Sequence, residues 1–149
     1  MKAGIDYIGV SVTFICHDGK GNFLMHKRSK NVRDEQERWE FGGGKLEFGE
    51  KVLDGLKREV GEEYGCDLFI DESLPPTELH REHNGTKTHW ITFPHIVRVN
   101  PEEAKINEPE SMDEIGWFTL DTLPSPLHSG IPLFIEHYQD YFTKYGKPS

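Results

Sequence analysis

The chain has 149 residues and a formal net charge of −9, from 17 basic and 26 acidic side chains. This balance argues against a general binder of DNA, RNA or anionic membrane, because such a protein needs a basic face. The length predicts a single domain spanning residues 1–149 with a hydrophobic core. We therefore expect neither a nucleic-acid polymer nor a membrane as partner. A small phosphorylated ligand stays open, since a metal ion can bridge two anionic groups.

The N-terminal sequence and the cysteines indicate a cytoplasmic location. The first ten residues, MKAGIDYIGV, lack the apolar stretch and cleavage site of a signal peptide. The longest apolar run, Tyr7–Cys16, is too short and too interrupted to span a bilayer. Cys16 and Cys66 lie in apolar contexts, which favours two free thiols in a reducing compartment and leaves a disulfide open.

The first part of the chain is expected to form strands and turns. Apolar residues alternate along Tyr7–Cys16, which predicts a strand, and Phe23–Arg28 is the expected returning strand. The polar segment Ser29–Glu37 predicts a loop. Trp39–Phe41 is expected to be short and extended, and it ends on three glycines.

A helix is predicted from Lys51 to Tyr64, because apolar residues spaced three and four apart form one stripe. Gly65 is suited to the residue after the helix end. Gly55 and Gly61 lie inside the helix and should each cost about 1 kcal/mol relative to alanine. The helix must therefore gain its stability from packing.

The remaining elements complete a mixed architecture. In chain order, we expect a strand at Cys66–Ile70, hairpin strands at Glu78–His83 and Lys87–Val99 joined by Asn84-Gly85, an acidic loop at Asn107–Glu114, a strand at Trp117–Thr119, and a helix capped by Ser129, with Pro132 in its first turn, that ends near Lys144. This order predicts an α/β (α+β) fold with a mixed sheet flanked by helices.

Three glutamates share one face of the predicted helix. A residue advances about 100° around a helix, so Glu63 lies about 40° to one side of Glu59 and Glu62 about 60° to the other. A solvated acidic face is the alternative interpretation. Like charges one turn apart repel, however, and a divalent cation with its preference for oxygen ligands would relieve that repulsion. Without an ion, the crowding should raise the pKa of at least one of these glutamates.

The spacing around these glutamates matches a family pattern. The matching positions are Gly44, Glu50, Arg58, Glu59, Val60, Glu62, Glu63, Gly65 and Cys66. They resemble the Nudix box, and the chain is similar to the Nudix hydrolases. This resemblance implies the Nudix fold, an α/β/α sandwich with a mixed sheet, and an enzyme that hydrolyses a nucleoside diphosphate linked to another group.

The resemblance also implies roles for the residues of the box. Glu59, Glu62 and Glu63 would bind Mg²⁺ or Mn²⁺, and the carbonyl of Gly43 or Gly44 would add a further ligand. Glu63 and Glu62 are also the candidates for catalysis.

Five further residues are expected to support the box or to activate water. Glu50 and Arg58 would form a structural ion pair. At Gly42 many family members have proline, so the glycine loop is expected to be less rigid here. In the acidic loop, Glu110 is the catalytic candidate and Glu114 its substitute, with a merely solvated loop as the alternative.

Substrate-binding candidates are charged or aromatic. Arg28 and Lys45 could neutralise phosphate oxygens, or they could be plain surface charges. Trp39 and Trp90 could stack on a base, or they could belong to the core, as could Tyr7 and Phe93. His80 and His83 are predicted to lie on opposite faces of their strand, which argues against zinc binding.

The sequence around the box looks most like that of MutT-type nucleoside triphosphate pyrophosphohydrolases. A metal ion would then acidify a bound water, and a glutamate would take its proton. The alternatives are hydrolysis of ADP-ribose or another nucleotide sugar, hydrolysis of a dinucleoside polyphosphate, and a non-catalytic nucleotide sensor. Many relatives are homodimers, although no interface signature is recognisable in this chain.

Overall fold

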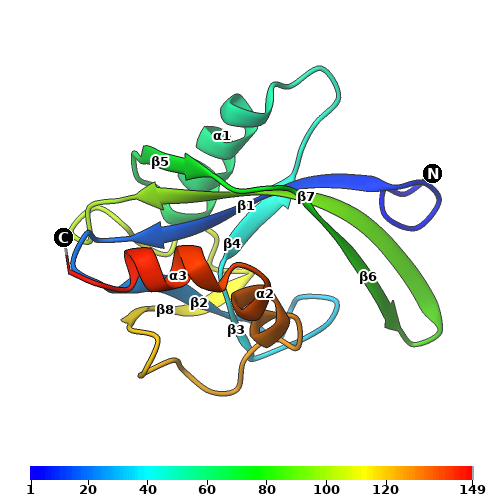
Figure 1. The fold of residues 1–149 in the computed structure, drawn as a ribbon. Coiled ribbons are helices and arrows are strands. Elements are labelled where there is room, and N and C mark those ends of the chain that lie inside the picture. Colours follow the sequence, from blue (N-terminus) through cyan, green and yellow to red (C-terminus); the bar gives the residue numbers. More distant parts are fainter. Residues whose placement is uncertain (149) are drawn as a thin grey trace.

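The computed structural model describes residues 1–148, and its centre is one sheet of eight strands (Figure 1). The strands are β1 (Gly9–His17), β2 (Phe23–Arg28), β3 (Trp39–Glu40), β4 (Gly42–Lys45), β5 (Phe69–Ser73), β6 (Thr77–His83), β7 (Thr86–Arg98) and β8 (Met112–Phe118). The helices are α1 (Val52–Tyr64), α2 (Ile131–His137) and α3 (Gln139–Tyr145).

Strand β1 lies at the middle of the sheet and makes it mixed. It pairs in parallel with β7 along its whole length, from Gly9 opposite Trp90 to His17 opposite Arg98. It also pairs antiparallel with β4 and, at one end, with β2. Every other strand pair among residues 1–148 is antiparallel. The predicted mixed sheet is confirmed.

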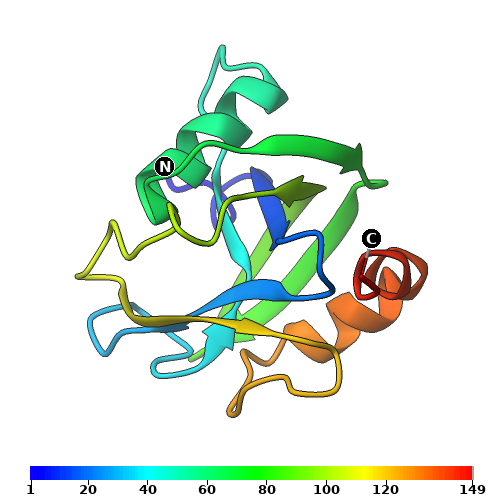
Figure 2. The ribbon, with the colours of Figure 1, turned by 90° about the vertical axis from the view of Figure 1, so that its left-hand side faces the viewer.

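The helices cover opposite faces of the sheet, as Figure 2 shows with α1 on one side and α2 and α3 on the other. Alternation along β1 divides the core between the two faces. Phe14 packs in one buried cluster with Leu56 and Tyr64 of α1, whereas Ile15 packs in the other with Phe142 of α3. The predicted α/β/α sandwich is therefore confirmed. None of the helices in the described part of the chain is both long and apolar enough for a membrane span.

The triple glycine forms a strand instead of the predicted loop. Gly42–Lys45 is β4, and it pairs with Ser11–Phe14 of β1. A Cβ atom at Gly42 would lie 2.0 Å from the ring of Phe14, so a side chain has no room there. Glycine has a low strand propensity in general, and the close approach to a buried phenylalanine explains its presence in this strand.

Two of the predicted strands have boundaries that are wrong by three residues or more. The strand expected at Cys66–Ile70 begins only at Phe69 and continues to Ser73. The strand expected at Trp117–Thr119 begins earlier, at Met112, and shortens the acidic loop. In both cases the partner strand, β7 or β2, sets the length of the pairing, and local propensity does not.

The predicted C-terminal helix is two helices, α2 and α3, which meet at Tyr138. The hydroxyl of Tyr138 donates to the carbonyl of Pro75 over 2.6 Å, and its ring is buried. This anchor fixes a non-helical backbone at Tyr138, with φ −110° and ψ 29°. The N-cap is Gly130 and not Ser129, whose hydroxyl contacts the carboxylate of Glu35 instead.

The predicted hairpin is confirmed. Asn84 and Gly85 have φ values of 50° and 80°, and two positive values suit the twist of a two-residue turn. The far part of β6 and β7 extends away from the body of the molecule (Figure 1). Cys16 and Cys66 are both free, and burial raises the pKa of the Cys16 thiol well above its usual value.

The two glycines inside α1 differ in their surroundings. A Cβ at Gly55 would lie 2.6 Å from Leu46 and 2.9 Å from a carboxylate oxygen of Glu50, whereas a Cβ at Gly61 would meet nothing within 4 Å.

We predict that Gly61→Ala stabilises the protein by about 0.5–1 kcal/mol, because alanine has the higher helix propensity and the site is open. Gly55→Ala should lose that gain and destabilise the protein by about 1 kcal/mol or more through overpacking. Urea unfolding of both variants measures the difference. Equal free energies of unfolding would contradict the packing argument.

Candidate active site

Helix α1 presents its acidic face toward the glycine strand β4. Leu56, Val60 and Tyr64 are fully buried and fix the rotation of the helix about its axis. The helix ends at Gly65, whose φ of 60° is left-handed as the sequence predicted for this residue. With the helix rotation fixed in this way, the carboxylates of Glu59 and Glu63 lie against β4.

Glu63 is the most deeply placed of these carboxylates. It is 6% exposed, and the backbone N–H of Gly43 donates to its Oε2 over 3.2 Å. Burial, followed by the charges of Glu40, Glu59 and Glu108, raises the pKa of Glu63 well above its ordinary value. This direction agrees with the crowding argument made from the sequence.

Glu59 packs on the bare backbone of Gly44. A Cβ at Gly44 would lie 2.1 Å from a carboxylate oxygen of Glu59, so only glycine leaves this space. Burial raises the pKa of Glu59, and the charges of Glu62 and Glu108 add to the rise despite a hydrogen bond from Arg58. The two glycines predicted as metal-site residues thus each contact one carboxylate of the helix.

Arg58 ties the loop before the helix to the acidic face. Its Nε and Nη2 donate to the two carboxylate oxygens of Glu50 over 2.7 and 2.8 Å, and Nη2 also donates to the carbonyl of Lys45 over 3.2 Å. Its Nη1 contacts Glu59 at 2.8 Å and Glu62 at 3.2 Å. The bidentate pair lowers the pKa of Glu50 to about 2.

In the acidic loop, the charge of Glu108 contributes to the raised pKa values of Glu59 and Glu63, whereas the catalytic residue predicted from the sequence is Glu110. Glu108 is half-buried, and burial together with the charges of Glu62 and Glu110 raises its pKa. The side chains of Glu110 and Glu114 are exposed. Ser29 Oγ donates to the backbone carbonyl of Glu110 over 2.6 Å and thereby anchors the loop. The sequence Glu108-Pro-Glu110 marks an acidic segment, but spacing alone does not indicate which of its two glutamates is partly buried.

A buried polar network beside Glu63 was missed by the sequence analysis. His26 Nε2 lies 2.9 Å from Glu40 Oε2, and Arg28 Nη1 donates to the same oxygen over 3.0 Å. His26 Nδ1 lies 2.7 Å from the hydroxyl of Tyr64. Burial opposes ionisation of Glu40, yet the hydrogen bond and charge of His26 and the charge of Arg28 lower its pKa overall. No spacing rule in the sequence links these residues.

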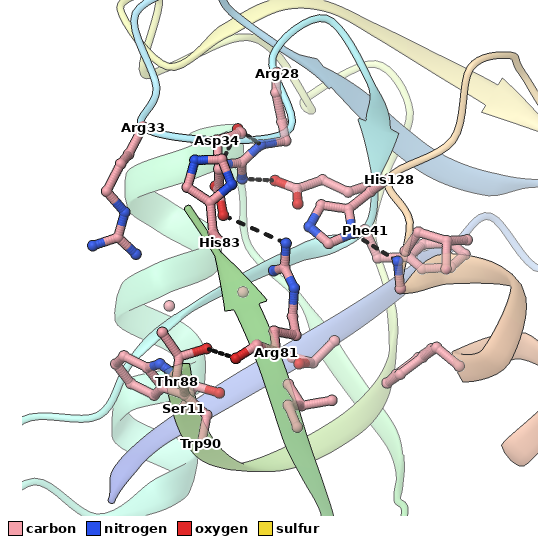
Figure 3. Close-up of a pocket in the computed structure, with 18 of the residues that line it drawn as sticks. Ser11, Arg28, Arg33, Asp34, Phe41, Arg81, His83, Thr88, Trp90 and His128 are labelled. Carbon is pink, nitrogen blue, oxygen red and sulfur yellow. Dashed lines mark hydrogen bonds and ion pairs between the residues drawn. The ribbon is translucent and has the colours of Figure 1, made fainter. Parts of the chain in front are cut away.

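A cavity of about 680 Å³ adjoins the glycine strand (Figure 3). Four of the residues predicted for the site line it: Arg28, Gly43, Gly44 and Trp90. Trp39 does not line it, because its ring is buried and packs against Phe118 with 5.3 Å between centroids. Lys45 does not line it either, and its side chain is exposed.

Three arginines stand at the cavity wall. Arg28 forms an ion pair with Asp34 at 2.9 Å, and Arg81 contacts Asp34 and Glu35 at 3.4 Å. Arg33 makes no ion pair with a carboxylate in the described part of the chain, and Figure 3 shows its side chain at the edge of the cavity. The cavity therefore offers one unneutralised guanidinium to an anion.

The donor set of the cluster fits a hard divalent cation. It consists of carboxylate oxygens from α1 and from the acidic loop together with the backbone of β4, and oxygen is the ligand that Mg²⁺ and Mn²⁺ prefer. Burial is the main cause of the raised pKa values of Glu59, Glu63 and Glu108, and the neighbouring carboxylates raise them further. A cation would relieve this second contribution.

Comparisons with known proteins agree with this arrangement. A family model described as NUDIX domain matches residues 8–138. Among solved structures, a MutT NUDIX hydrolase from Burkholderia pseudomallei superposes with a TM-score of 0.76 and 27% identity, covering 88% of this chain and 98% of that one. A MutT protein from Methanosarcina mazei Go1 has a TM-score of 0.62 and 25% identity, covering 93% of this chain and 92% of that one. The chain belongs to the NUDIX domain family.

The curated relatives are longer than the part of them that matches this chain. The mouse protein named 8-oxo-dGDP phosphatase NUDT18 is 30% identical over 108 residues, which are 71% of this chain and 31% of the relative. An RNA pyrophosphohydrolase of Bartonella bacilliformis is 30% identical over 105 residues, which are 58% of this chain and 61% of the relative. The chain thus spans less than two thirds of the length of each of these relatives.

The raised pKa of Glu63 predicts how the stability of the metal-free protein, kept free of ions by a chelator, depends on pH. The folded state favours the protonated carboxyl, so its contribution is complete below the unfolded pKa of about 4.3 and is lost as pH rises through the folded pKa. Glu63→Gln keeps a carbonyl oxygen for the Gly43 N–H. We expect this variant to lose less stability than the wild type between acidic and neutral pH.

Thermal unfolding midpoints measured across pH in EDTA test this expectation. Glu136→Gln, on the exposed surface of α2, is the matched control and should follow the wild type. Parallel curves for Glu63→Gln and the wild type would show that Glu63 is not the responsible group.

Proposed function

We propose that the chain hydrolyses the pyrophosphate linkage of a nucleoside triphosphate or a related nucleoside diphosphate compound in the presence of Mg²⁺, giving a nucleoside monophosphate and pyrophosphate when the substrate is a triphosphate. The observation that carries the proposal is the set of crowded carboxylates on α1 beside a cavity of nucleotide size. One relative is named as a phosphatase of 8-oxo-dGDP and another as an RNA pyrophosphohydrolase, which supports an anhydride between phosphates as the bond attacked.

Each acidic residue has a distinct part in this proposal. Glu59 and Glu63 are suited to holding a divalent ion, with Glu62, because Arg58 and the Gly43 N–H fix the positions of their oxygens. Such an ion would neutralise phosphate oxygens and lower the pKa of a bound water. Glu108 is suited to accept the proton of the attacking water at a carboxylate oxygen, because its side chain is half-buried and its charge acts on the glutamates of α1.

The cavity supports a small nucleotide over a polymer. Arg33 can donate hydrogen bonds to a phosphate oxygen, and the indole of Trp90, which also lines the cavity, offers a surface for a base (Figure 3). A net charge of −9 disfavours a long polyanion. The two free cysteines support a reducing compartment such as the cytoplasm.

A nucleotide panel tests the function directly. We expect phosphate-release assays with Mg²⁺ to detect hydrolysis of at least one nucleoside triphosphate or nucleoside diphosphate derivative, including 8-oxo-dGDP, and EDTA to abolish it. Glu63→Gln should lower kcat by about 100-fold or more, whereas Glu136→Gln should leave it unchanged. Nucleotide binding without turnover in the wild type would favour a non-catalytic sensor.

A paired substitution in the acidic loop separates its two glutamates. Glu108→Gln should lower kcat by about 100-fold, because Glu108 is the half-buried member that interacts with Glu62. Glu110→Gln should change kcat by less than about threefold, since its side chain is exposed and its anchoring contact uses the backbone. The reverse order would assign the catalytic role to Glu110, as predicted from the sequence.

A further inference from the structure

A second group of metal-ligand side chains lies on the β6–β7 hairpin, away from the glutamates of α1. His80 of β6 is directly opposite His89 of β7, and Glu78 precedes His80 by two residues on the same face of the strand. The Nε2 atoms of the two histidines lie 3.2 and 3.0 Å from the same carboxylate oxygen of Glu78. The three side chains thus converge on one point.

The distances within this group match a coordination sphere. One ligand atom from each of the three residues lies within 4.8 Å of the others. In a tetrahedral zinc site with bonds of about 2.0–2.1 Å, neighbouring ligand atoms are about 3.3 Å apart. The two observed nitrogen-to-oxygen distances differ from this value by a few tenths of an ångström, and the ligand atoms of the two histidines lie within 4.8 Å of each other, so side-chain rotations can bring all three onto one ion.

Packing does not explain why these side chains are gathered. Those of His80 and Glu78 are 63% and 62% exposed, and that of His89 is 33% exposed. The alternate residues of the hairpin, Leu79 and Arg81, have their side chains on the opposite face and line the cavity. The group therefore belongs to the other face, where no core requires two imidazoles with ring centroids 4.0 Å apart.

The donor types select a metal class different from that of the glutamate cluster. Two neutral imidazoles and one carboxylate carry a net charge of −1, and imidazole suits zinc and its neighbours, whereas Mg²⁺ prefers oxygen. The sequence argument against zinc compared His80 with His83. The structure instead pairs His80 with His89 across the hairpin, a partner that depends on strand register.

We propose that Glu78, His80 and His89 bind Zn²⁺ or a similar divalent transition metal, with the fourth coordination position open to water. The ion cross-links β6 and β7, and the opposite face of these strands forms a wall of the cavity. The proposal does not depend on the hydrolytic function of the chain.

Co²⁺ titration of the full chain tests the site by its visible absorption, with excess Mg²⁺ present to occupy the glutamate cluster. We expect one equivalent of Co²⁺ to give the absorption bands of a four- or five-coordinate ion, and Zn²⁺ to displace it. His89→Ala and, separately, His80→Ala should each weaken Co²⁺ binding by at least about tenfold. Substituting a residue that only hydrogen-bonds to a metal ligand already lowers metal affinity by about this factor, and these residues are proposed as ligands themselves.

His83→Ala is the matched control, because His83 is on the same hairpin but lines the cavity, and it should retain the bands. Absence of bands in the wild type, or equal affinity in His89→Ala, would overturn the proposal. Bands lost in Glu59→Gln but kept in His89→Ala would also overturn it, since the ion would then belong to α1. Circular dichroism checks that each variant is folded, and anomalous scattering from Zn²⁺-soaked wild-type crystals locates the ion without any substitution.

Discussion

The site depends on the close contact between an acidic helix face and a strand without side chains. Glu59 lies over Gly44, and Glu63 accepts a hydrogen bond from Gly43, so two carboxylates reach the backbone of β4. A methyl group at position 44 would occupy the space of the Glu59 carboxylate. Glycine is therefore required here for close approach, at a cost in strand propensity that the pairing of β4 with β1 offsets.

This contact concentrates negative charge, and the surrounding residues compensate only part of it. Arg58 contacts three carboxylates at once, and its strongest contact is the bidentate pair with Glu50 outside the cluster. Glu63 receives a backbone N–H but no guanidinium from the described residues. The cluster is thus held in position without being neutralised by the side chains around it.

The sequence predicted those parts whose signals are local. Helix α1, its left-handed end at Gly65 and the Asn84-Gly85 turn each depend on a few neighbouring residues, and the structure agrees with them. The fold class followed from the order of elements and from nine fixed positions of the box.

What the sequence could not predict depends on contacts between distant segments. Strand β4 is defined by its pairing with β1, where Gly42 leaves room for Phe14, and the hydroxyl of Tyr138 at the break between α2 and α3 reaches Pro75. The burial of Glu108 and the exposure of Glu110 depend on the path of a loop that Ser29 anchors from a distant segment. Pattern and propensity carry no information about such partners, whose positions are set only by the assembled sheet.

The two ends of the described chain lie in different surroundings. Lys2 and Ile5 line the cavity, the carbonyl of Gly4 accepts from the backbone of His89, and Trp90 fills the space where a side chain at Gly4 would be. Pro148 instead bridges to Lys20 in the turn between β1 and β2, at the opposite end of the molecule (Figure 1). A purification handle or fusion partner joined ahead of Met1 would crowd the cavity mouth, whereas one joined behind Pro148 would leave it clear.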